Sequence, residues 1–401
     1  MRLFYFVTDS YPAWRVDLAE LFSHELKQFG LHTDWSMRRD DSGIWCAIEK
    51  NGETIYLPFF LSGIPIVTPI ARRFGEFMSE IYLTGKLIFG PRYDFIQVRD
   101  DRYTAAFFAW LAAKIRGSKF IYWVSFPFPE NDLEKAKLST GLRKAFFQLR
   151  GNLTMWWLYK IVLPRADHVF VQTERMKQNI MAYGLAKSKM TPVAMGVSMK
   201  LFEWKRTAKH EVERGSVTYL GTFARSRHLE TIIQAFALVI LQLPSAKLYL
   251  VGRGDIPQDR QFLEELVKQS GLSNNVIFTG FLPIDEAWAV AAKSEICISP
   301  IYPSFIHLQS SPTKLYEYMA LGRPVIGNDH PEQSNALASS GAGLCVPWNE
   351  QSFANAMIYM LMHTDDAQKM GEKGPEWVEE NRRYDHIAAL VYRQYQVLLD
   401  K

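Results

Sequence analysis

The residues with the clearest chemical purpose lie between 309 and 325, in the segment QSSPTKLYEYMALGRPV. Ser311 and Pro312 form a pair that commonly starts a helix, with the serine as N-cap and the proline in the first turn. The free backbone amides at such a helix start attract a phosphate group, and Lys314 would stand beside it. Glu317 falls three residues later on the same face, where a carboxylate accepts hydrogen bonds from a ribose diol. A surface ion pair between Lys314 and Glu317 is the plainer alternative.

Glycines follow several apolar runs in the second half of the chain. Gly221, Gly252 and Gly280 each stand where such a run ends. Glycine lets backbone amides approach an anion closely, and Arg225 or Arg227 could neutralise a pyrophosphate with paired hydrogen bonds. Ordinary turns and solvated arginines are the alternative. Together these residues indicate an anionic ligand.

The elements that must position these residues follow from the hydrophobic pattern. Short apolar runs alternate with amphipathic stretches of helical length, which is typical of βαβ units and parallel sheets. Such sheets bind ligands at the carboxyl ends of their strands, where the glycines and arginines lie. The predicted strands are 3–7, 95–98, 120–124, 167–173, 217–222, 247–252, 276–280, 296–300 and 324–327, and helices are predicted over 313–321 and 384–399 among others.

Length and composition fit two α/β domains. The chain has 401 residues, of which 48% are hydrophobic, enough for two cores of about 200 residues each. Cys46, Cys297 and Cys345 are far apart, which argues against a disulfide framework and a zinc site. The net charge of +4 is too small to indicate a nucleic-acid-binding protein. The first apolar run is too short for a signal peptide and no run is long enough to span a membrane, so we expect a cytoplasmic protein.

The second half resembles glycosyltransferase family 4, a large family of retaining enzymes with the GT-B fold. The segment from Pro312 to Val325 is the most specific part of the resemblance. It implies two Rossmann-like, doubly wound parallel-sheet domains that face a cleft. We expect them at 1–196 and 197–383, with a helix over 384–401 returning to the first. The resemblance also rests on Gly196, Val197, Gly221, Thr222, Arg225, Arg227, the run from Leu250 to Gly254, the run from Val276 to Phe281, Ser299 and Pro300.

The resemblance implies a nucleoside diphosphate sugar as donor, linked to UDP or GDP, with no cofactor and no metal. The diphosphate would lie on Arg225, Arg227 or Lys314, and the ribose on Glu317. The first domain would bind the acceptor, a glycan or lipid-linked glycan, as in cell-surface polysaccharide biosynthesis. The implied donor site comprises Gly221, Thr222, Arg225, Arg227, Gly252, Arg253, Gly280, Phe281, Ser311, Thr313, Lys314 and Glu317.

The implied reaction is retaining and needs little protein nucleophilic chemistry. Arg225 and Lys314 would stabilise the departing diphosphate, while Gln309 and Ser125 take the positions that contact the sugar. The chain departs from the family pattern at both, since many members carry glutamate and histidine there. The usual Gly-Gly pair is also absent from residues 8–15.

These departures leave other functions open. One is a catalytically impaired homologue that acts as a binding partner, and a GT-B epimerase or phosphorylase is another. An inverting enzyme would need a base from the first half, with Asp9, Asp100, Asp101 and Glu130 as candidates. A self-paired loop is the interpretation we favour for at least two of the four residues 99–102, RDDR.

Residues 142–160 combine bulky apolar side chains with four cations, Arg143, Lys144, Arg150 and Lys160, and no acid. A basic amphipathic helix with tryptophans suits an anionic membrane interface, where it would bring the protein to a lipid-linked acceptor at the inner membrane. A core helix with a solvated basic face is the alternative. Residues 66–77 are a second, weaker candidate.

Overall fold

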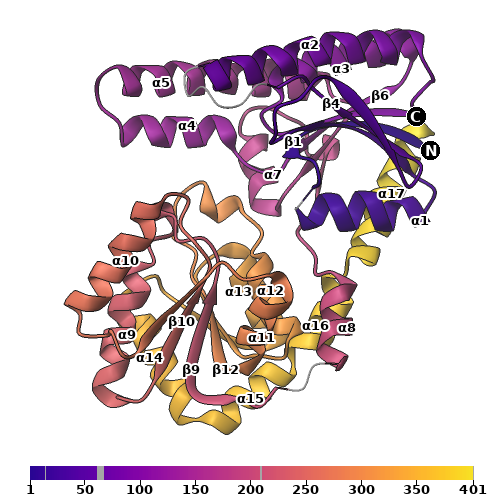
Figure 1. The fold of residues 1–401 in the computed structure, drawn as a ribbon. Coiled ribbons are helices and arrows are strands. Elements are labelled where there is room, and N and C mark those ends of the chain that lie inside the picture. Colours follow the sequence, from indigo (N-terminus) through magenta and orange to yellow (C-terminus); the bar gives the residue numbers. More distant parts are fainter. Residues whose placement is uncertain (14, 61–66, 208–209, 401) are drawn as a thin grey trace. The chain divides into compact units, whose positions relative to one another are not determined.

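The structure is a computed structural model of the chain, and it describes residues 1–13, 15–60, 67–207 and 210–400. The chain folds into two compact units, each built on one β-sheet covered by helices (Figure 1). Unit 1 comprises residues 1–194 and the segment that begins at Tyr384, and unit 2 comprises residues 195–383. No helix among the described residues has the length and apolar character needed to cross a bilayer.

Within the described residues, the sheet of unit 1 has eight strands in the order β3-β4-β2-β1-β5-β6-β7-β8. The central strand β1 is buried from Leu3 to Val7, as expected for a parallel strand covered on both faces. The chain order reverses between β1 and β5, which pair in parallel. The strands are β1 (Arg2–Ser10), β2 (His32–Arg38), β3 (Cys46–Lys50), β4 (Glu53–Leu57), β5 (Phe95–Arg99), β6 (Lys119–Val124), β7 (His168–Val171) and β8 (Met190–Pro192).

Helices cover both faces of this sheet. One core packs α2, α3, η2 and α7 against it, and the other packs η1, α1 and the last helix α17. The Tyr395 hydroxyl of α17 donates a hydrogen bond of 2.6 Å to the Gln97 side chain of β5. The helical segments are η1 (Asp17–Glu25), α1 (Leu26–Gln28), α2 (Val67–Phe89), α3 (Tyr103–Arg116), α4 (Phe128–Lys137), α5 (Gly141–Trp156), η2 (Trp157–Val162), α6 (Leu163–Arg165), α7 (Glu174–Met181), η3 (Lys187–Lys189) and α17 (Tyr384–Leu399).

In the described part of unit 2, six parallel strands follow the order β11-β10-β9-β12-β13-β14. This is the strand order of a dinucleotide-binding Rossmann fold, and it reverses between β9 and β12. In such sheets the loops that leave the carboxyl ends of the two strands diverge, and ligands bind in the crevice between them. The strands are β9 (Glu213–Leu220), β10 (Lys247–Val251), β11 (Val276–Gly280), β12 (Ser294–Ser299), β13 (Val325–Asn328) and β14 (Gly343–Val346).

The helices of unit 2 also divide between two cores. One core holds α9, α10 and α14, and the other holds α8, α11, α12, α13 and α16. The helical segments are α8 (Met199–Thr207), η4 (Arg225–Arg227), α9 (Glu230–Gln242), α10 (Pro257–Gln269), α11 (Ile284–Lys293), η5 (His307–Gln309), α12 (Thr313–Ala320), α13 (Pro331–Ser340), α14 (Glu350–Met362), α15 (Thr364–Glu372) and α16 (Gly374–Asn381).

The structure differs from the sequence prediction at one edge of unit 1. The doubly wound parallel sheet is confirmed, but it carries one added antiparallel strand at this edge, since β3 runs antiparallel to β4. Asn51 and Gly52 join the two strands with φ of 53° and 76°, the left-handed geometry of a two-residue hairpin turn. The sequence analysis had placed no strand between residues 31 and 94, where β2, β3 and β4 lie.

A buried ion network holds the carboxyl edge of unit 1. Arg99 is fully buried, and its guanidinium lies 2.6 Å from the Asp17 carboxylate and 3.1 Å from that of Asp100. Burial alone would raise the pKa of Asp17, but Arg99 and Arg15 hold it below its usual value. Arg102 pairs with Glu80 at 3.1 Å in the same interior. The charged residues at this edge therefore serve mainly to neutralise one another.

Replacing Asp17 by Ala should destabilise unit 1 by about 3–5 kcal/mol, because it leaves the Arg99 guanidinium buried with only part of its charge compensated. The measurement is urea unfolding followed by circular dichroism. Asp285→Ala is the matched control, since the Asp285 carboxylate forms an exposed pair with Lys200 at 3.6 Å, and exposed pairs contribute about 1 kcal/mol or less. Equal effects of the two substitutions would contradict a structural role for the Arg99 network.

Candidate functional site

Three strand ends of unit 2 meet through their backbones. Gly221 donates its N–H to the Val251 carbonyl at 2.8 Å, and Gly252 donates to the Gly280 carbonyl at 2.9 Å. A Cβ on Gly252, which has φ of 145°, would lie 1.8 Å from the Gly221 oxygen. A Cβ on Gly221, with φ of 155°, would lie 2.4 Å from Lys314 Nζ. The contact between these strand ends therefore requires glycine at 252, whereas glycine at 221 makes room for Lys314.

Helix α12 delivers Lys314 to the end of β9. Its Nζ lies 5.5 Å from the centroid of the Tyr219 ring. One turn further along α12, the Tyr318 hydroxyl accepts the Leu220 N–H at 2.7 Å and fixes the helix to β9. Since α12 follows β12, this contact lies where the strand order reverses, the usual ligand position in such sheets.

Lys314 and Glu317 are both half-buried on α12. Burial and the charge of Arg227 together lower the pKa of Lys314 to about 7, against the opposing charge of Glu317. Burial raises the pKa of Glu317 to about 7 against the charge of Lys314. Within the described residues neither side chain forms an ion pair within 4.0 Å. The plain surface pair is thus not what the structure contains, and both groups lack a close compensating charge.

Three arginines surround this point with different exposure. Arg227 is half-buried, and its charge lowers the pKa of both Lys314 and His307. Arg225 is exposed, and its guanidinium lies 3.3 Å from the centroid of the Phe262 ring. Arg253 is also exposed, 5.1 Å from the ring of Phe281. The structure therefore brings Arg227 to Lys314 and holds Arg225 against an aromatic ring.

The loop before α12 uses its polar side chains for internal contacts. The helix starts at Thr313 after Pro312, so the prediction that Ser311 is its N-cap is wrong. Ser311 Oγ instead donates to Glu332 at 3.2 Å and accepts the Met195 N–H at 3.1 Å. These contacts anchor the loop to the start of unit 2.

Gln309 is buried, with 2% of its surface exposed, and its amide donates to the Phe305 carbonyl at 3.0 Å. The exposed Thr222 has its carbonyl hydrogen-bonded by the Tyr219 hydroxyl at 3.0 Å. Phe281 has 68% of its surface exposed beyond Gly280.

The sequence analysis missed His307, which precedes Gln309 by two residues. Burial and the charge of Arg227 lower the pKa of His307 to about 4, so its ring is neutral near pH 7. His330 Nε2 donates a hydrogen bond to the His307 carbonyl at 3.0 Å. A histidine in a loop after a strand was a signal available in the sequence, although nothing in its spacing tied it to Lys314.

In unit 1, two of the four candidate bases are engaged. Asp100 accepts the Ser125 N–H at 2.7 Å and the Ser125 hydroxyl at 2.5 Å, in addition to its pair with Arg99. Glu130 accepts the Tyr159 hydroxyl at 2.6 Å. Burial raises the pKa of Asp9 and of Asp101, which among the described residues form only loose ion pairs, with Arg15 at 3.9 Å and with Arg73 at 4.0 Å.

A cavity of about 400 Å³ opens beside Asp101, just beyond the carboxyl end of β5. It lies where α2, α3, α4 and α5 meet. Phe77 and Phe146 supply aromatic surface, while Arg73, Asp101 and Asp132 supply charge. Rings combined with a few polar groups are typical of small-molecule sites.

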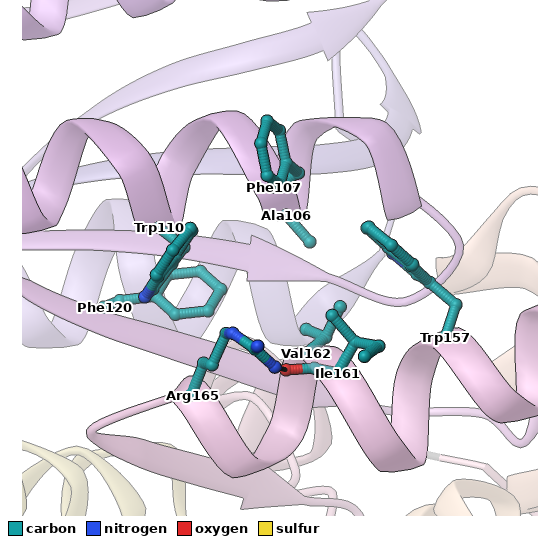
Figure 2. A pocket seen from close by; sticks show the side chains of 8 residues that line it. All are labelled: Ala106, Phe107, Trp110, Phe120, Trp157, Ile161, Val162 and Arg165. Carbon is teal, nitrogen blue, oxygen red and sulfur yellow. Dashed lines mark hydrogen bonds between the residues drawn. The ribbon is translucent and has the colours of Figure 1, made fainter.

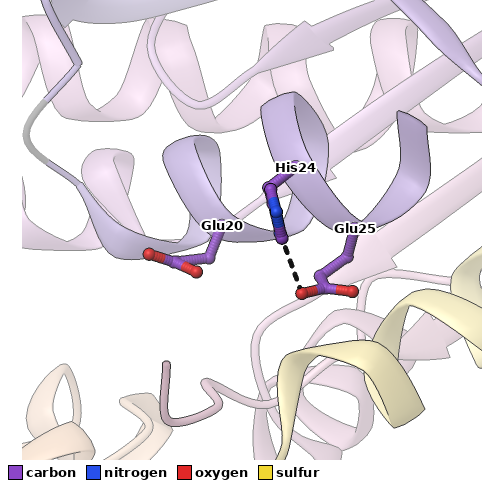
Figure 3. A group of neighbouring side chains, drawn as sticks. All are labelled: Glu20, His24 and Glu25. Atoms are coloured by element: carbon purple, nitrogen blue, oxygen red, sulfur yellow. Dashed lines mark hydrogen bonds and ion pairs between the residues drawn. The ribbon is translucent and has the colours of Figure 1, made fainter. Parts of the chain in front are cut away.

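Among the described residues, one group could hold a metal ion: Glu20, His24 and Glu25, whose ligand atoms lie within 4.8 Å of one another (Figure 3). It stands on η1 in unit 1, and the His24 ring contacts the Glu25 carboxylate at 3.0 Å. The His24 side chain is 63% exposed. Exposed acidic groups of this kind are common without a metal, and nothing else about this group points to one.

Two family matches cover consecutive parts of the chain. Residues 67–196 match the family described as "Glycosyl transferase 4-like domain", and residues 214–363 match "Glycosyl transferases group 1". The second match spans β9 to β14, and with them the Lys314 site. The chain belongs to this glycosyltransferase family. The resemblance seen in the sequence is confirmed.

A curated relative and two solved structures place this glycosyltransferase among known proteins. The GDP-mannose-dependent alpha-(1-6)-phosphatidylinositol monomannoside mannosyltransferase of Mycobacterium tuberculosis is 26% identical over 180 residues, 44% of this chain and 46% of the relative. The match thus spans about half of the relative's length.

Sucrose-phosphate synthase from Thermosynechococcus elongatus superposes with a TM-score of 0.73 at 21% identity, covering 100% of this chain and 99% of that one. Anabaena HepE in complex with UDP-glucose gives 0.68 at 13% identity, covering 99% and 100%. These likenesses show the fold, and the predicted GT-B fold is confirmed.

If Lys314 contacts the phosphates and Glu317 the ribose of a nucleotide, the shifted pKa values predict that binding is strongest near pH 7. A bound diphosphate favours protonated Lys314, so affinity should fall by up to tenfold per unit as pH rises above about 7. A bound ribose diol favours ionised Glu317, so affinity should also fall as pH drops below about 7. Calorimetric titration with UDP and with GDP across this range measures both limbs.

Lys314→Met should remove the fall in affinity above pH 7 (the alkaline limb of the profile). Glu317→Gln should remove the fall in affinity below pH 7 (the acidic limb). His363→Gln, a substitution of an exposed histidine that contacts its own helix, is the control and should leave both limbs in place. A pH profile that neither site variant alters would contradict the assignment.

Proposed function

We propose that this protein transfers a sugar from a nucleoside diphosphate sugar to a glycan or lipid-linked acceptor. The observation that carries the proposal is a pair of cations, Lys314 and Arg227, near Gly221, whose lack of a side chain leaves the backbone accessible. Within the described residues neither cation has a carboxylate within 4.0 Å. A half-buried pair of cations without partners suits a ligand that brings two negative charges, such as a diphosphate.

Glu317 extends the site from the diphosphate to the ribose. It stands one turn beyond Lys314 on α12, and its ionised form accepts two hydrogen bonds from a vicinal diol. Phe281, largely exposed beside Arg253, offers a surface against which the base can lie. The proposed contacts are therefore Phe281 for the base, Glu317 for the ribose and Lys314 for the diphosphate.

The donor that we propose is a UDP or GDP sugar, bound without a metal or cofactor. The solved neighbour HepE holds UDP-glucose and the curated relative uses GDP-mannose by name. Lys314 and Arg227 supply the positive charge that stabilises the leaving diphosphate. We assign the direct contact to Arg227, since the guanidinium of Arg225 rests on the Phe262 ring.

We infer a retaining reaction in which the protein positions the substrates and supplies no strong base. Asp100 and Glu130, two of the four carboxylates suited to an inverting reaction, already accept hydrogen bonds inside unit 1. Asp9 and Asp101 are the candidates that an inverting mechanism would use. The product anomer, determined by NMR, separates the two mechanisms.

The acceptor in this proposal binds to unit 1, in the cavity beside Asp101. Phe77 and Phe146 suit the apolar face of a sugar ring, while Asp101 and Arg73 suit its hydroxyl groups. Side chains of α5 line part of the same cavity. The exposed face of this helix indicates whether the acceptor is held in a membrane.

Helix α5 presents an unusually apolar surface. Five side chains at heptad spacing form one stripe, with exposed fractions from 53% to 91%. Arg143 and Lys144 flank the stripe without an acidic partner within 4.0 Å among the described residues, while Arg150 pairs with Asp132 on α4. The stripe consists of Leu142, Phe146, Leu149, Leu153 and Trp156.

We propose that this stripe rests peripherally on the cytoplasmic face of the plasma membrane and presents the cavity beside Asp101 to a lipid-linked glycan of cell-surface polysaccharide assembly. Apolar side chains with flanking cations bind an anionic lipid surface. On α2, Phe74 and Ile81 are also exposed, at 59% and 45%. Ile66, the start of the second predicted membrane segment, lies outside the described residues.

The donor assignment is tested by incubating the protein with UDP, GDP and ADP sugars and measuring thermal stability, donor hydrolysis and affinity. Arg227→Ala and Lys314→Met should each weaken binding of the preferred donor by about tenfold or more, because each removes a charge-assisted contact. Glu317→Ala should lower the affinity for the nucleotide about tenfold. Failure of every nucleotide sugar to stabilise the protein would refute the donor site.

Arg225→Ala is the matched control for Arg227→Ala, since both residues lie in η4. It should change donor affinity less than about twofold, because its guanidinium stacks on Phe262. A larger loss at Arg225 than at Arg227 would reverse the assignment. Donor binding without any hydrolysis or transfer would support the catalytically impaired homologue instead.

The membrane contact predicts a specific effect of substitutions on α5. Replacing both Leu149 and Leu153 by Ser should weaken binding to phosphatidylglycerol-containing vesicles by about tenfold or more, since the lost burial amounts to about 1.4 kcal/mol or more. Vesicle flotation measures the effect. Leu241 and Met362, exposed at 79% and 60% on helices of unit 2, provide a matched double-Ser control that should bind as the unchanged protein does. Equal loss in both variants would remove α5 from the contact.

A further inference from the structure

Unit 1 contains a second cavity, of about 290 Å³, on the seam between α3 and the continuous helix of η2 and α6. Figure 2 shows Phe107 and Trp110 projecting from α3, Trp157 and Arg165 from the other helix, and Phe120 of β6 behind them. Phe120 is the second residue of β6, at the amino end of the sheet. The cavity therefore lies away from the carboxyl edge used in the proposed function.

The walls of this cavity are apolar and aromatic. The Phe107 ring lies 6.0 Å from that of Trp110 and 6.4 Å from that of Trp157. Phe107 remains 43% exposed, and both tryptophans are half-buried. Trp157 Nε1 is already used, since it donates to the Tyr103 carbonyl at 3.3 Å. The walls therefore expose aromatic surface to a ligand. They offer few polar groups that could hold a sugar.

Positive charge gathers at one end of the cavity. The guanidinium of Arg165 and the ammonium of Lys114 each lie 5.7 Å from the centroid of the Trp110 ring. An adjoining groove shares Trp110, Phe120 and Arg165 with the cavity, and it is also lined by Lys114, Lys119 and Asp167. The Asp167 carboxylate accepts the Phe120 N–H at 2.7 Å, and among the described residues none of the three cations has an acid within 4.0 Å.

We propose that this cavity binds an anionic amphiphile, a single apolar chain that ends in a phosphate or carboxylate. Its volume accommodates about ten water-sized groups, since each takes up about 30 Å³. The chain lies against Phe107, Trp110 and Trp157, and its anionic end reaches Arg165 with Lys114. An apolar slot with one charged end selects for this kind of ligand over a sugar or a nucleotide.

The test is calorimetric titration of the full chain with decyl phosphate below its micelle concentration. We expect saturable binding of one molecule per chain. Decyltrimethylammonium, with the opposite charge, should bind at least about tenfold more weakly, and inorganic phosphate should not bind detectably. Binding that is unsaturable, or equal for the two amphiphiles, overturns the proposal.

Two variants locate the site. Arg165→Gln should lower the affinity for decyl phosphate about tenfold, because it removes a charge-assisted contact. Ala106→Leu, a substitution at the cavity wall, should abolish binding by filling the space. Lys50→Gln, at an exposed cation of β3 outside the cavity, is the control and should bind as the unchanged protein does.

Arg165→Gln alters an exposed side chain, so it keeps the proposal testable if Ala106→Leu fails to fold. Unchanged affinity in Arg165→Gln overturns the proposal. Thermal stabilisation by UDP or GDP, measured on the same samples, reports the donor site of unit 2 separately, so failure here is distinguishable from failure of the proposed function.

Discussion

The close approach of two strand ends in unit 2 is the constraint on which the rest of the candidate site depends. Gly252 can touch the Gly221 carbonyl only because Gly252 has no side chain, since a Cβ there would lie 1.8 Å from that oxygen. The same absence at Gly221 leaves the space that Lys314 Nζ fills. The bond from the Leu220 N–H to Tyr318 then fixes α12 against β9. Backbone geometry thus sets the position of the lysine before any ligand arrives.

This arrangement keeps ionisable groups in an unfavourable state without a ligand. Burial moves the pKa of Lys314 and of Glu317 to about 7 from opposite sides, so each spends part of its time neutral near that pH. An anionic ligand restores the charge on Lys314, and the energy of that compensation appears as binding. Groups perturbed in this way are found at functional sites more often than at structural ones.

The sequence predicted the elements whose signals are local. An apolar strand followed by glycine predicted the edge at Gly221 and Gly252, and helical spacing placed Lys314 and Glu317 on α12. The hairpin at Asn51-Gly52 carried a readable turn signal that the analysis did not use. The pair between Asp17 and Arg99 joins residues 82 positions apart, and no local pattern specifies such a contact. The stacking of Arg225 on the Phe262 ring is equally invisible in the sequence, which made Arg225 and Arg227 look equivalent.

The two sheets handle charge at their carboxyl edges in opposite ways. In unit 1, Arg99 and Arg102 are neutralised by acids of the same unit. Asp100 also accepts a hydrogen bond from the Ser125 hydroxyl. In unit 2, Lys314 and Arg227 have no such acid within 4.0 Å among the described residues. An edge already neutral favours a neutral, hydroxyl-rich ligand, whereas an edge with unmatched cations favours an anion. The division of labour we propose, acceptor on unit 1 and nucleotide on unit 2, follows from this contrast in electrostatics and does not depend on the sugar contacts at Gln309.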